Sequence, residues 1–136
     1  MGAGRPPAGS TCPVTSAQVT ELVEAPVTVS DRSVGTCTFV AGGDHPGITV
    51  EVSLRRVDDG ESFDALLAAA DAAVGPVERR AIGPAERGYV ASVGIGARVV
   101  AVDGDRLVEV AVTEPGALPE DVAADAVALA EAALSP

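Results

Sequence analysis

Two cysteines carry the clearest chemical signal in the sequence. Cys12 follows a Gly/Pro-rich stretch, and Cys37 opens the short apolar run CTFV. A thiol at the edge of a polar stretch gains little from burial, so we predict a disulfide between Cys12 and Cys37. The alternative is two unrelated buried thiols. A structural disulfide is typical of an oxidising, extracytoplasmic compartment.

The same residues argue against a metal or redox centre. Two cysteines at this spacing and a single histidine do not make a zinc site, and no Cys-x-x-Cys pair is present. His45 beside Asp44 has the chemistry of a general base, but it lies in a Gly/Pro turn with no nucleophile placed by a motif, which favours a surface histidine. We therefore expect no catalytic residues, no metal and no cofactor.

Other charged groups have simple structural explanations. Asp103 and Asp105 are potential Ca²⁺ ligands, but the rest of an EF-hand-like loop is missing, so turn chemistry is the better interpretation. A solvated loop and a helix start account for Asp58, Asp59 and Glu61.

Two further patterns point to a ligand only weakly. Residues 94–96 (Gly-Ile-Gly) lack the third glycine and the following helix of a nucleotide-binding loop. Two arginine pairs fall on strands that we expect to be neighbours. They suggest either an anion-binding face or, as we prefer, pairing with the many carboxylates; the residues are Arg55, Arg56, Arg79 and Arg80.

The elements that must position these residues are organised around residues 97–113. Two Val-rich runs flank the turn Asp103-Gly104-Asp105, which predicts a β-hairpin. On its second arm Val108, Val110 and Val112 share one face. A lone hairpin is barely stable, so we place it in the middle of an antiparallel sheet.

Periodicity predicts the remaining elements. A capping box at Thr15 and Gln18 starts a first helix, Ser62 caps a second whose apolar stripe runs from Phe63 to Val74, and Pro119 opens a third. The helices cover 15–24, 62–74 and 119 onward; the strands cover 37–40, 48–57, 77–82 and 87–93, with a turn over 30–35. This order predicts an α+β fold, an antiparallel sheet with helices on its faces, as in an α/β/α sandwich.

Composition narrows the class of protein. The 136 residues are 47% hydrophobic with a net charge of −11, and nine arginines are scattered without any lysine. We predict one domain over 12–136, preceded by a flexible tether or an expression remnant over 1–11. The acidity argues against nucleic-acid binding, and no stretch can span a bilayer. Residues 1–11 lack the apolar core of a signal peptide.

Short motifs resemble a family of small actinobacterial cell-envelope lipoproteins of unknown function. They are Cys12 to Val19 (CPVTSAQV), Cys37-Thr38-Phe39, and Ile82 to Ala85 (IGPA) ahead of the late hairpin; Pro84 and a missing acidic pair depart from the family pattern. The resemblance implies a lipid-anchored or secreted domain, with the lipidated cysteine upstream of residue 1. It also implies an α/β/α sandwich like that of PsbP-type and Mog-type proteins, and it lends no catalytic residues.

We therefore expect a non-catalytic, extracytoplasmic binding or sensor module of the cell envelope. Its partner would be an unknown envelope protein or small ligand, and it would meet the membrane only through an upstream lipid anchor. The alternative is a carrier of a small apolar ligand or lipid, held between sheet and helix in a cavity left by small Ala and Val side chains. The ligand-binding residues are unknown at this stage.

Overall fold

The computed structural model describes residues 12–33, 35–42, 47–57 and 61–134. In this part of the chain three helices and seven strands are present. The helices are α1 (Ser16–Val23), α2 (Glu61–Val74) and α3 (Pro119–Leu134). The strands are β1 (Val27–Ser33), β2 (Thr36–Ala41), β3 (Thr49–Arg56), β4 (Glu78–Arg79), β5 (Arg87–Val93), β6 (Gly96–Asp103) and β7 (Arg106–Thr113).

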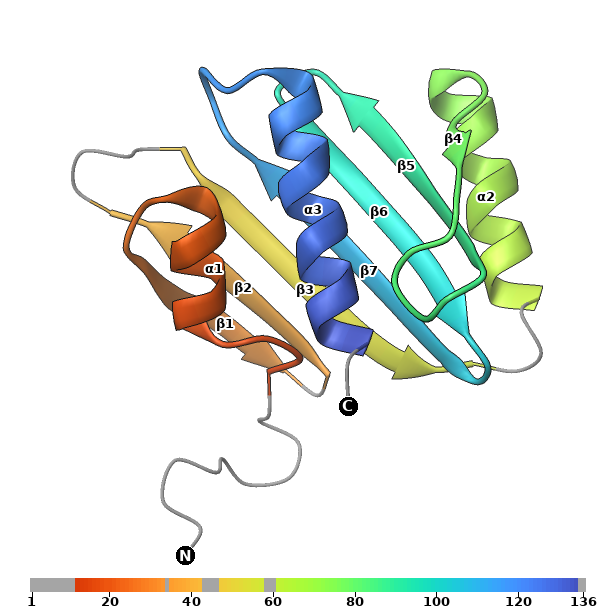
Figure 1. Ribbon diagram of the computed structural model, residues 1–136, viewed down its shortest axis with the longest axis horizontal. Coiled ribbons are helices and arrows are strands. Elements are labelled where there is room, and N and C mark those ends of the chain that lie inside the picture. Colours follow the sequence, from red (N-terminus) through yellow and green to blue (C-terminus); the bar gives the residue numbers. More distant parts are fainter. Residues whose placement is uncertain (1–11, 34, 43–46, 58–60, 135–136) are drawn as a thin grey trace, which may run out of the picture.

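The strands form one antiparallel sheet in the order β1-β2-β3-β7-β6-β5-β4, so the predicted hairpin β6–β7 lies at its centre (Figure 1). Helices α1 and α3 lie side by side on one face, and α2 packs on the other. The predicted α+β fold, with an antiparallel sheet and helices on its faces, is confirmed.

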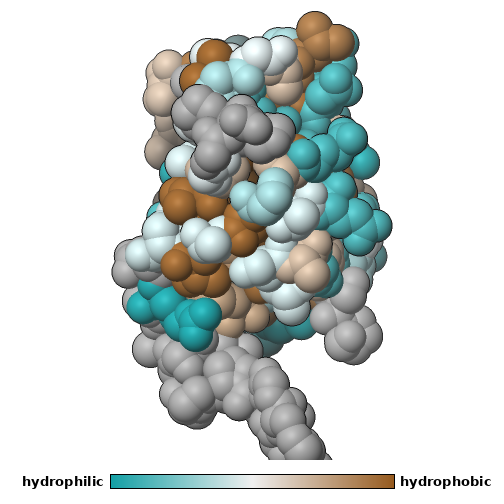
Figure 2. Space-filling view, turned by 90° about the vertical axis from the view of Figure 1, so that its left-hand side faces the viewer, coloured by the Kyte–Doolittle hydropathy of each residue, from teal (hydrophilic) through white to brown (hydrophobic). Residues whose placement is uncertain are grey.

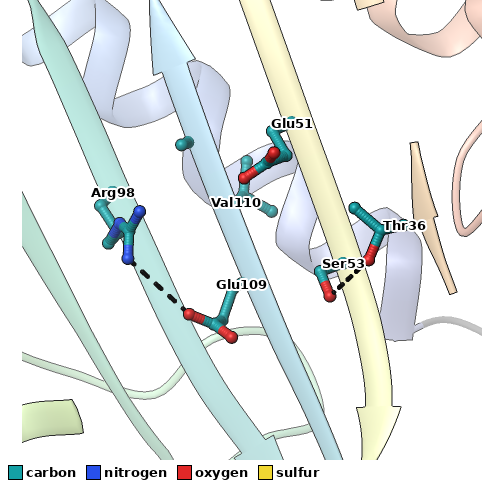
Figure 3. A pocket seen from close by; sticks show the side chains of 7 residues that line it. Thr36, Glu51, Ser53, Arg98, Glu109 and Val110 are labelled. Atoms are coloured by element: carbon teal, nitrogen blue, oxygen red, sulfur yellow. Dashed lines mark hydrogen bonds and ion pairs between the residues drawn. The ribbon is translucent and has the colours of Figure 1, made fainter. Parts of the chain in front are cut away.

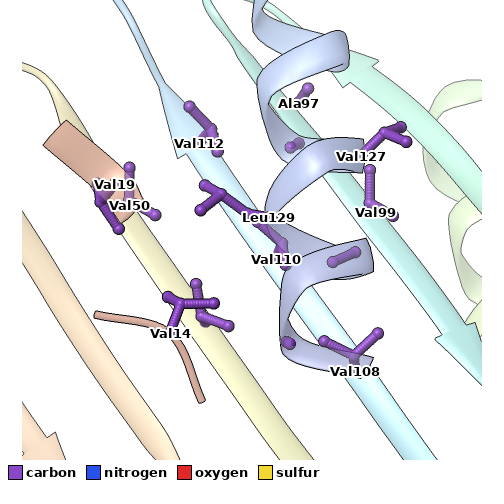
Figure 4. Close-up of a cluster of buried hydrophobic side chains, with 14 of the residues drawn as sticks. Val14, Val19, Val50, Ala97, Val99, Val108, Val110, Val112, Val127 and Leu129 are labelled. Atoms are coloured by element: carbon purple, nitrogen blue, oxygen red, sulfur yellow. The ribbon is translucent and has the colours of Figure 1, made fainter. Parts of the chain in front are cut away.

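The main core lies between the sheet and α1 and α3 (Figure 4). Val108, Val110 and Val112 are buried there, as their alternation predicts. Small residues on α3, among them Ala126 and Ala130, are fully buried and let the helix approach the valine-rich strands closely. The main core is therefore built mostly from small aliphatic side chains, with Phe39 as the one aromatic side chain in the cluster.

The predicted disulfide joins the start of the described chain to this core. Cys12 is bonded to Cys37 with 5.5 Å between the Cα atoms, and Cys37 is fully buried on β2. The bond ties the segment ahead of α1 to the sheet. A cross-link closing a loop of this length contributes about 3 kcal/mol through the lost entropy of the unfolded chain.

A second, smaller cluster lies under α2. Phe63 and Tyr89 meet there with ring centroids 5.9 Å apart, and the Tyr89 hydroxyl donates to the Leu66 carbonyl at 3.4 Å. The strand residues of this cluster come from β5, β6 and the start of β7; they include Ala91, Val100, Val102 and Leu107. Helix α2 thus covers only one side of its face of the sheet.

The helix ends follow local signals in the sequence. Thr15 caps α1 in a capping box with Gln18, as predicted. Gly75, with φ of +85°, ends α2 in the left-handed conformation that glycine adopts without strain. Pro119 is the first residue of α3. Helix α2 already includes Glu61, so the predicted cap at Ser62 is wrong; Val74 is 45% exposed and does not belong to the buried stripe.

Two strand predictions are also corrected. Residues 30–33 belong to strand β1 and do not form a turn. This edge strand has polar residues and an irregularity between Val29 and Asp31, which hide the alternation expected of a strand. The predicted strand over 77–82 shrinks to Glu78–Arg79, because Pro76 has no N–H to extend the ladder and the chain turns at Gly83.

Candidate functional site

In the described part of the chain, no helix covers the α2 side of the sheet over β2, β3 and the part of β7 after Leu107. The outward side chains there are mostly hydroxyls and charges, among them Thr36, Glu51, Ser53 and Glu109. On the opposite face the same strands bear the buried valines of the main core. The alternation on these strands therefore produces one dry face and one polar, solvent-exposed face.

A hollow of about 160 Å³ lies in this polar face (Figure 3). Seven residues line it: Thr36, Glu51, Ser53, Arg98, Glu109, Val110 and Ala111. Strand pairing places Ala111 opposite both Glu51 and Arg98. The methyl group of Ala111 is shorter than the side chains beside it, and this difference leaves the space.

Polar contacts hold part of the hollow in place. The Glu109 carboxylate lies 3.8 Å from Arg98 and 3.5 Å from Arg55, and Ser53 is opposite it on β3. Thr36 Oγ1 donates to Ser53 Oγ at 3.0 Å. Figure 3 shows the Arg98–Glu109 ion pair and the Thr36–Ser53 hydrogen bond on either side of the hollow.

Glu51 differs from these residues because, among the described residues, it has no ion-pair or hydrogen-bond partner. Its carboxylate is free to accept hydrogen bonds from a ligand. Together with the two hydroxyls and the Arg98 guanidinium, the hollow offers donors and acceptors within one small area. The lining contains no histidine or cysteine, and its Glu109 carboxylate pairs with Arg55 and Arg98. This arrangement suits recognition of a polar group.

The predicted arginine pairs do not form a common face. Arg55 and Arg56 lie on β3, whereas Arg79 is on β4 at the far edge of the sheet. The prediction that they lie on neighbouring strands is wrong, because three strands separate β3 from β4. The preferred interpretation, pairing with carboxylates, is confirmed: Arg55 pairs with Glu109, Arg56 with Asp105, Arg79 with Asp71, and Arg80 with Glu78.

A second hollow, of about 400 Å³, lies beside α2 and is lined partly by Arg79, Arg80 and Arg87. Each of these three arginines already has a carboxylate as its ion-pair partner. Arg87 pairs with Asp64 and stacks over the Phe63 ring, 4.8 Å from its centroid. The Val77 N–H donates to Asp71 at 3.0 Å, and this bond, aided by Arg79, lowers the pKa of the Asp71 carboxyl. This hollow therefore has the character of an ion-paired surface.

The remaining predicted site residues fall outside any site. Asp103 and Arg106 form an ion pair of 2.9 Å across the β6–β7 turn. Gly104 in this turn has a φ of +63°, so the turn interpretation is confirmed. Gly94 and Ile95 form the tight turn between β5 and β6, and Gly96 begins β6. Four predicted residues, Asp44, His45, Asp58 and Asp59, lie outside the described residues.

Glu114 is a site residue that sequence reasoning missed. It follows β7, is only 7% exposed, and its Oε1 atom has no hydrogen-bond partner. Burial, the facing Asp125 carboxyl and the nearby Asp121 and Glu24 raise the pKa of Glu114 to about 8. In the sequence it precedes Pro115 and Gly116, which is typical of an exposed loop, so no local signal indicates its burial.

Comparison with known protein families, with characterised proteins and with solved structures gave no match. In the part of the chain that the structure describes, no group of three metal-ligating side chains is assembled. No described helix has the length and apolar character needed to cross a membrane.

Proposed function

We propose that this chain is a non-catalytic binding module of the cell envelope, which recognises a polar partner through the uncovered face of β2, β3 and β7. The observation that carries the proposal is the hollow at Ala111, with the unpartnered Glu51 beside two hydroxyls. Polar groups that converge in a concave site can fix the orientation of a bound partner.

The Cys12–Cys37 disulfide supports the location that we propose. Such bonds persist outside the reducing cytoplasm. The resemblance of Cys12 to Val19 to the start of actinobacterial envelope lipoproteins leads us to propose a lipid anchor upstream of residue 1. An anchored domain of this size would present its open face to an envelope protein or a glycan.

The lining chemistry favours binding over catalysis. Glu109 is held between two arginines, and the Thr36 hydroxyl donates to the Ser53 hydroxyl. A nucleophile needs an adjacent base, and a general base needs access to a substrate proton. We therefore assign these residues to hydrogen bonding and charge recognition.

Site-directed cross-linking tests this proposal. A photo-reactive phenylalanine analogue in place of Ser53 should capture one discrete species from an actinobacterial envelope extract. The same analogue in place of Ala17, which is exposed on α1 on the other face, serves as the matched control and should capture none. Ala111→Leu fills the hollow and should abolish capture at position 53. Equal capture at both positions, or none at Ser53, would contradict the proposal.

One observation favours the carrier alternative. A hollow of about 460 Å³ lies between β5 and the start of α3, with Val90, Ala123 and Val127 among its lining residues. The charged side chains of Glu78, Arg80 and Glu120 surround it, which suits a lipid headgroup better than a wholly apolar ligand. Native mass spectrometry after incubation with envelope lipid extract should then show a retained ligand of discrete mass. Ala123→Trp should remove it, and Ala17→Trp should not.

A further inference from the structure

The buried carboxyl of Glu114 is the least expected polar group in the described part of the chain. Glu114 directly follows β7, and its carboxyl is near acidic residues of the first turns of α3 and of the end of α1. It is 7% exposed, and its Oε1 atom has no hydrogen-bond partner. Burying an ionised carboxylate in such a place is costly, and the group stays neutral instead.

Among the described residues, the charges that face Glu114 are all negative. Asp125 and Asp121 come from α3, and Glu24 comes from the end of α1. The β5–β6 turn also touches this position, since the Ile95 carbonyl accepts the Glu114 N–H at 3.2 Å, but that turn carries no charged residue. Asp125 is close enough to share a hydrogen bond with Glu114, and two carboxyls can share one only while a proton lies between them.

The backbone beside this cluster is held in an unusual conformation. Glu24 is the C-cap of α1 with φ of +57°, and it is the single non-glycine residue with positive φ among those described. The left-handed region costs an ordinary residue free energy, so it persists only while the surroundings enforce it. The other end of α1 is anchored through the Cys12–Cys37 bond. The α1 end at Glu24 is therefore the one that can release.

We propose that Glu114 and Asp125 form a pH-sensitive clasp that holds the end of α1 and the first turns of α3 against β7. With one shared proton the two carboxyls attract each other. When that proton leaves to solvent, the buried Glu114 carboxylate and the half-buried Asp125 carboxylate face Asp121 and Glu24, and the repulsion loosens both helices at this end. The clasp lies on the covered face of the sheet, so the inference does not depend on the proposed binding face.

The raised pKa of Glu114 fixes the direction in which pH changes the opening of the clasp. When the clasp opens and Glu114 is solvated, its pKa returns to about 4.5, while in the closed clasp it is about 8. Between these values the open state has lost a proton that the closed state keeps, so opening becomes more favourable as pH rises. A group of this kind changes the opening equilibrium by up to about tenfold per pH unit, and the change levels off above pH 8.

Hydrogen exchange of the full, disulfide-bonded chain tests the clasp. Exchange in α1 and in residues 119–126 is measured from pH 5 to 9 and corrected for the intrinsic amide rate. We expect it to rise with pH and then level off, while exchange in α2 stays constant. Glu114→Gln should keep both helices at their low-pH protection throughout. Glu120→Gln, an exposed carboxyl on the same helix, should retain the wild-type profile.

Two results would overturn the clasp: an α1 profile independent of pH in the wild-type chain, or a Glu114→Gln profile as steep as the wild type. If Glu114→Gln does not fold, ¹³C NMR titration of the wild-type carboxyls decides the matter. A Glu114 carboxyl that titrates at the ordinary value for glutamate would refute the clasp, and one that titrates near pH 8 would support it.

Discussion

At the scale of single residues, Gly88 shows how tightly β5 is packed. A Cβ atom built there would lie 2.5 Å from Cγ1 of Ile82 and 3.2 Å from the Val100 carbonyl oxygen. Ile82 is fully buried, so it cannot swing outward to make room. We expect Gly88→Ala to lower the free energy of unfolding by roughly 1–3 kcal/mol, measured by urea denaturation.

The matched control is Gly42→Ala. No atom of the described residues lies within 4 Å of a Cβ built at Gly42, and its φ is not in the left-handed region. Its effect should stay within about 0.5 kcal/mol. If the two variants are equally stable, the contact between β5 and the Ile82 loop is not as close as the structure has it.

Residue-level chemistry is predictable from the sequence only where a local pattern reports it. The Cys12–Cys37 pair and the Asp103–Asp105 turn have such patterns, and both are confirmed. The hollow at Ala111 and the burial of Glu114 do not. They arise from which strands become neighbours in the sheet and from where α1 and α3 meet, and neither is encoded within a short window of sequence.

At the scale of elements, α2 is held by fewer buried side chains than α3. Phe63 is its one fully buried anchor among the described residues of α2 that line the sheet, whereas the apolar face of α3 is buried along its whole length. We expect Phe63→Ala to cost about 3 kcal/mol and to detach α2 first. Hydrogen exchange should show protection lost in α2 while α3 keeps its own.

Val74→Ala is the control on the same helix. Val74 is 45% exposed, so its truncation should change the unfolding free energy by less than about 0.5 kcal/mol. Equal loss of protection in α2 and α3 after Phe63→Ala would mean that the two faces of the sheet unfold as one cooperative unit, against our expectation.

The strands also show which sequence patterns are sufficient to predict an element. Strands β3 and β7 were predicted well because each has one buried and one polar face, and this alternation is visible in the sequence. Strand β1 was missed because an edge strand has only one partner and tolerates polar residues and an irregular register. Figure 2, viewed from the side of α1 and β1, shows apolar side chains interrupted by polar ones over this edge.

At the scale of the whole molecule, Glu114 makes stability depend on pH. Its pKa is raised from 4.5 to about 8 on folding, so the stability that it contributes is complete below pH 4.5 and is lost as pH rises through 8. Solvent that reaches the cluster screens part of this effect, and we expect a loss of roughly 2 kcal/mol. Urea denaturation of Glu114→Gln across this range should be nearly flat; a slope equal to the wild type would exclude Glu114 as its source.

The Cys12–Cys37 bond acts on the molecule in a different way, because it constrains the unfolded chain. Its loop contains α1, β1 and the start of β2, so reduction removes a covalent constraint on these elements. We expect the Cys12→Ser/Cys37→Ser double variant to lose about 3 kcal/mol of stability at every pH, measured by urea denaturation. The pH slope set by Glu114 should survive in it, since the serines leave the carboxyl cluster in place. A slope that disappears together with the disulfide would mean that the bond, by anchoring α1, is what keeps Glu114 buried.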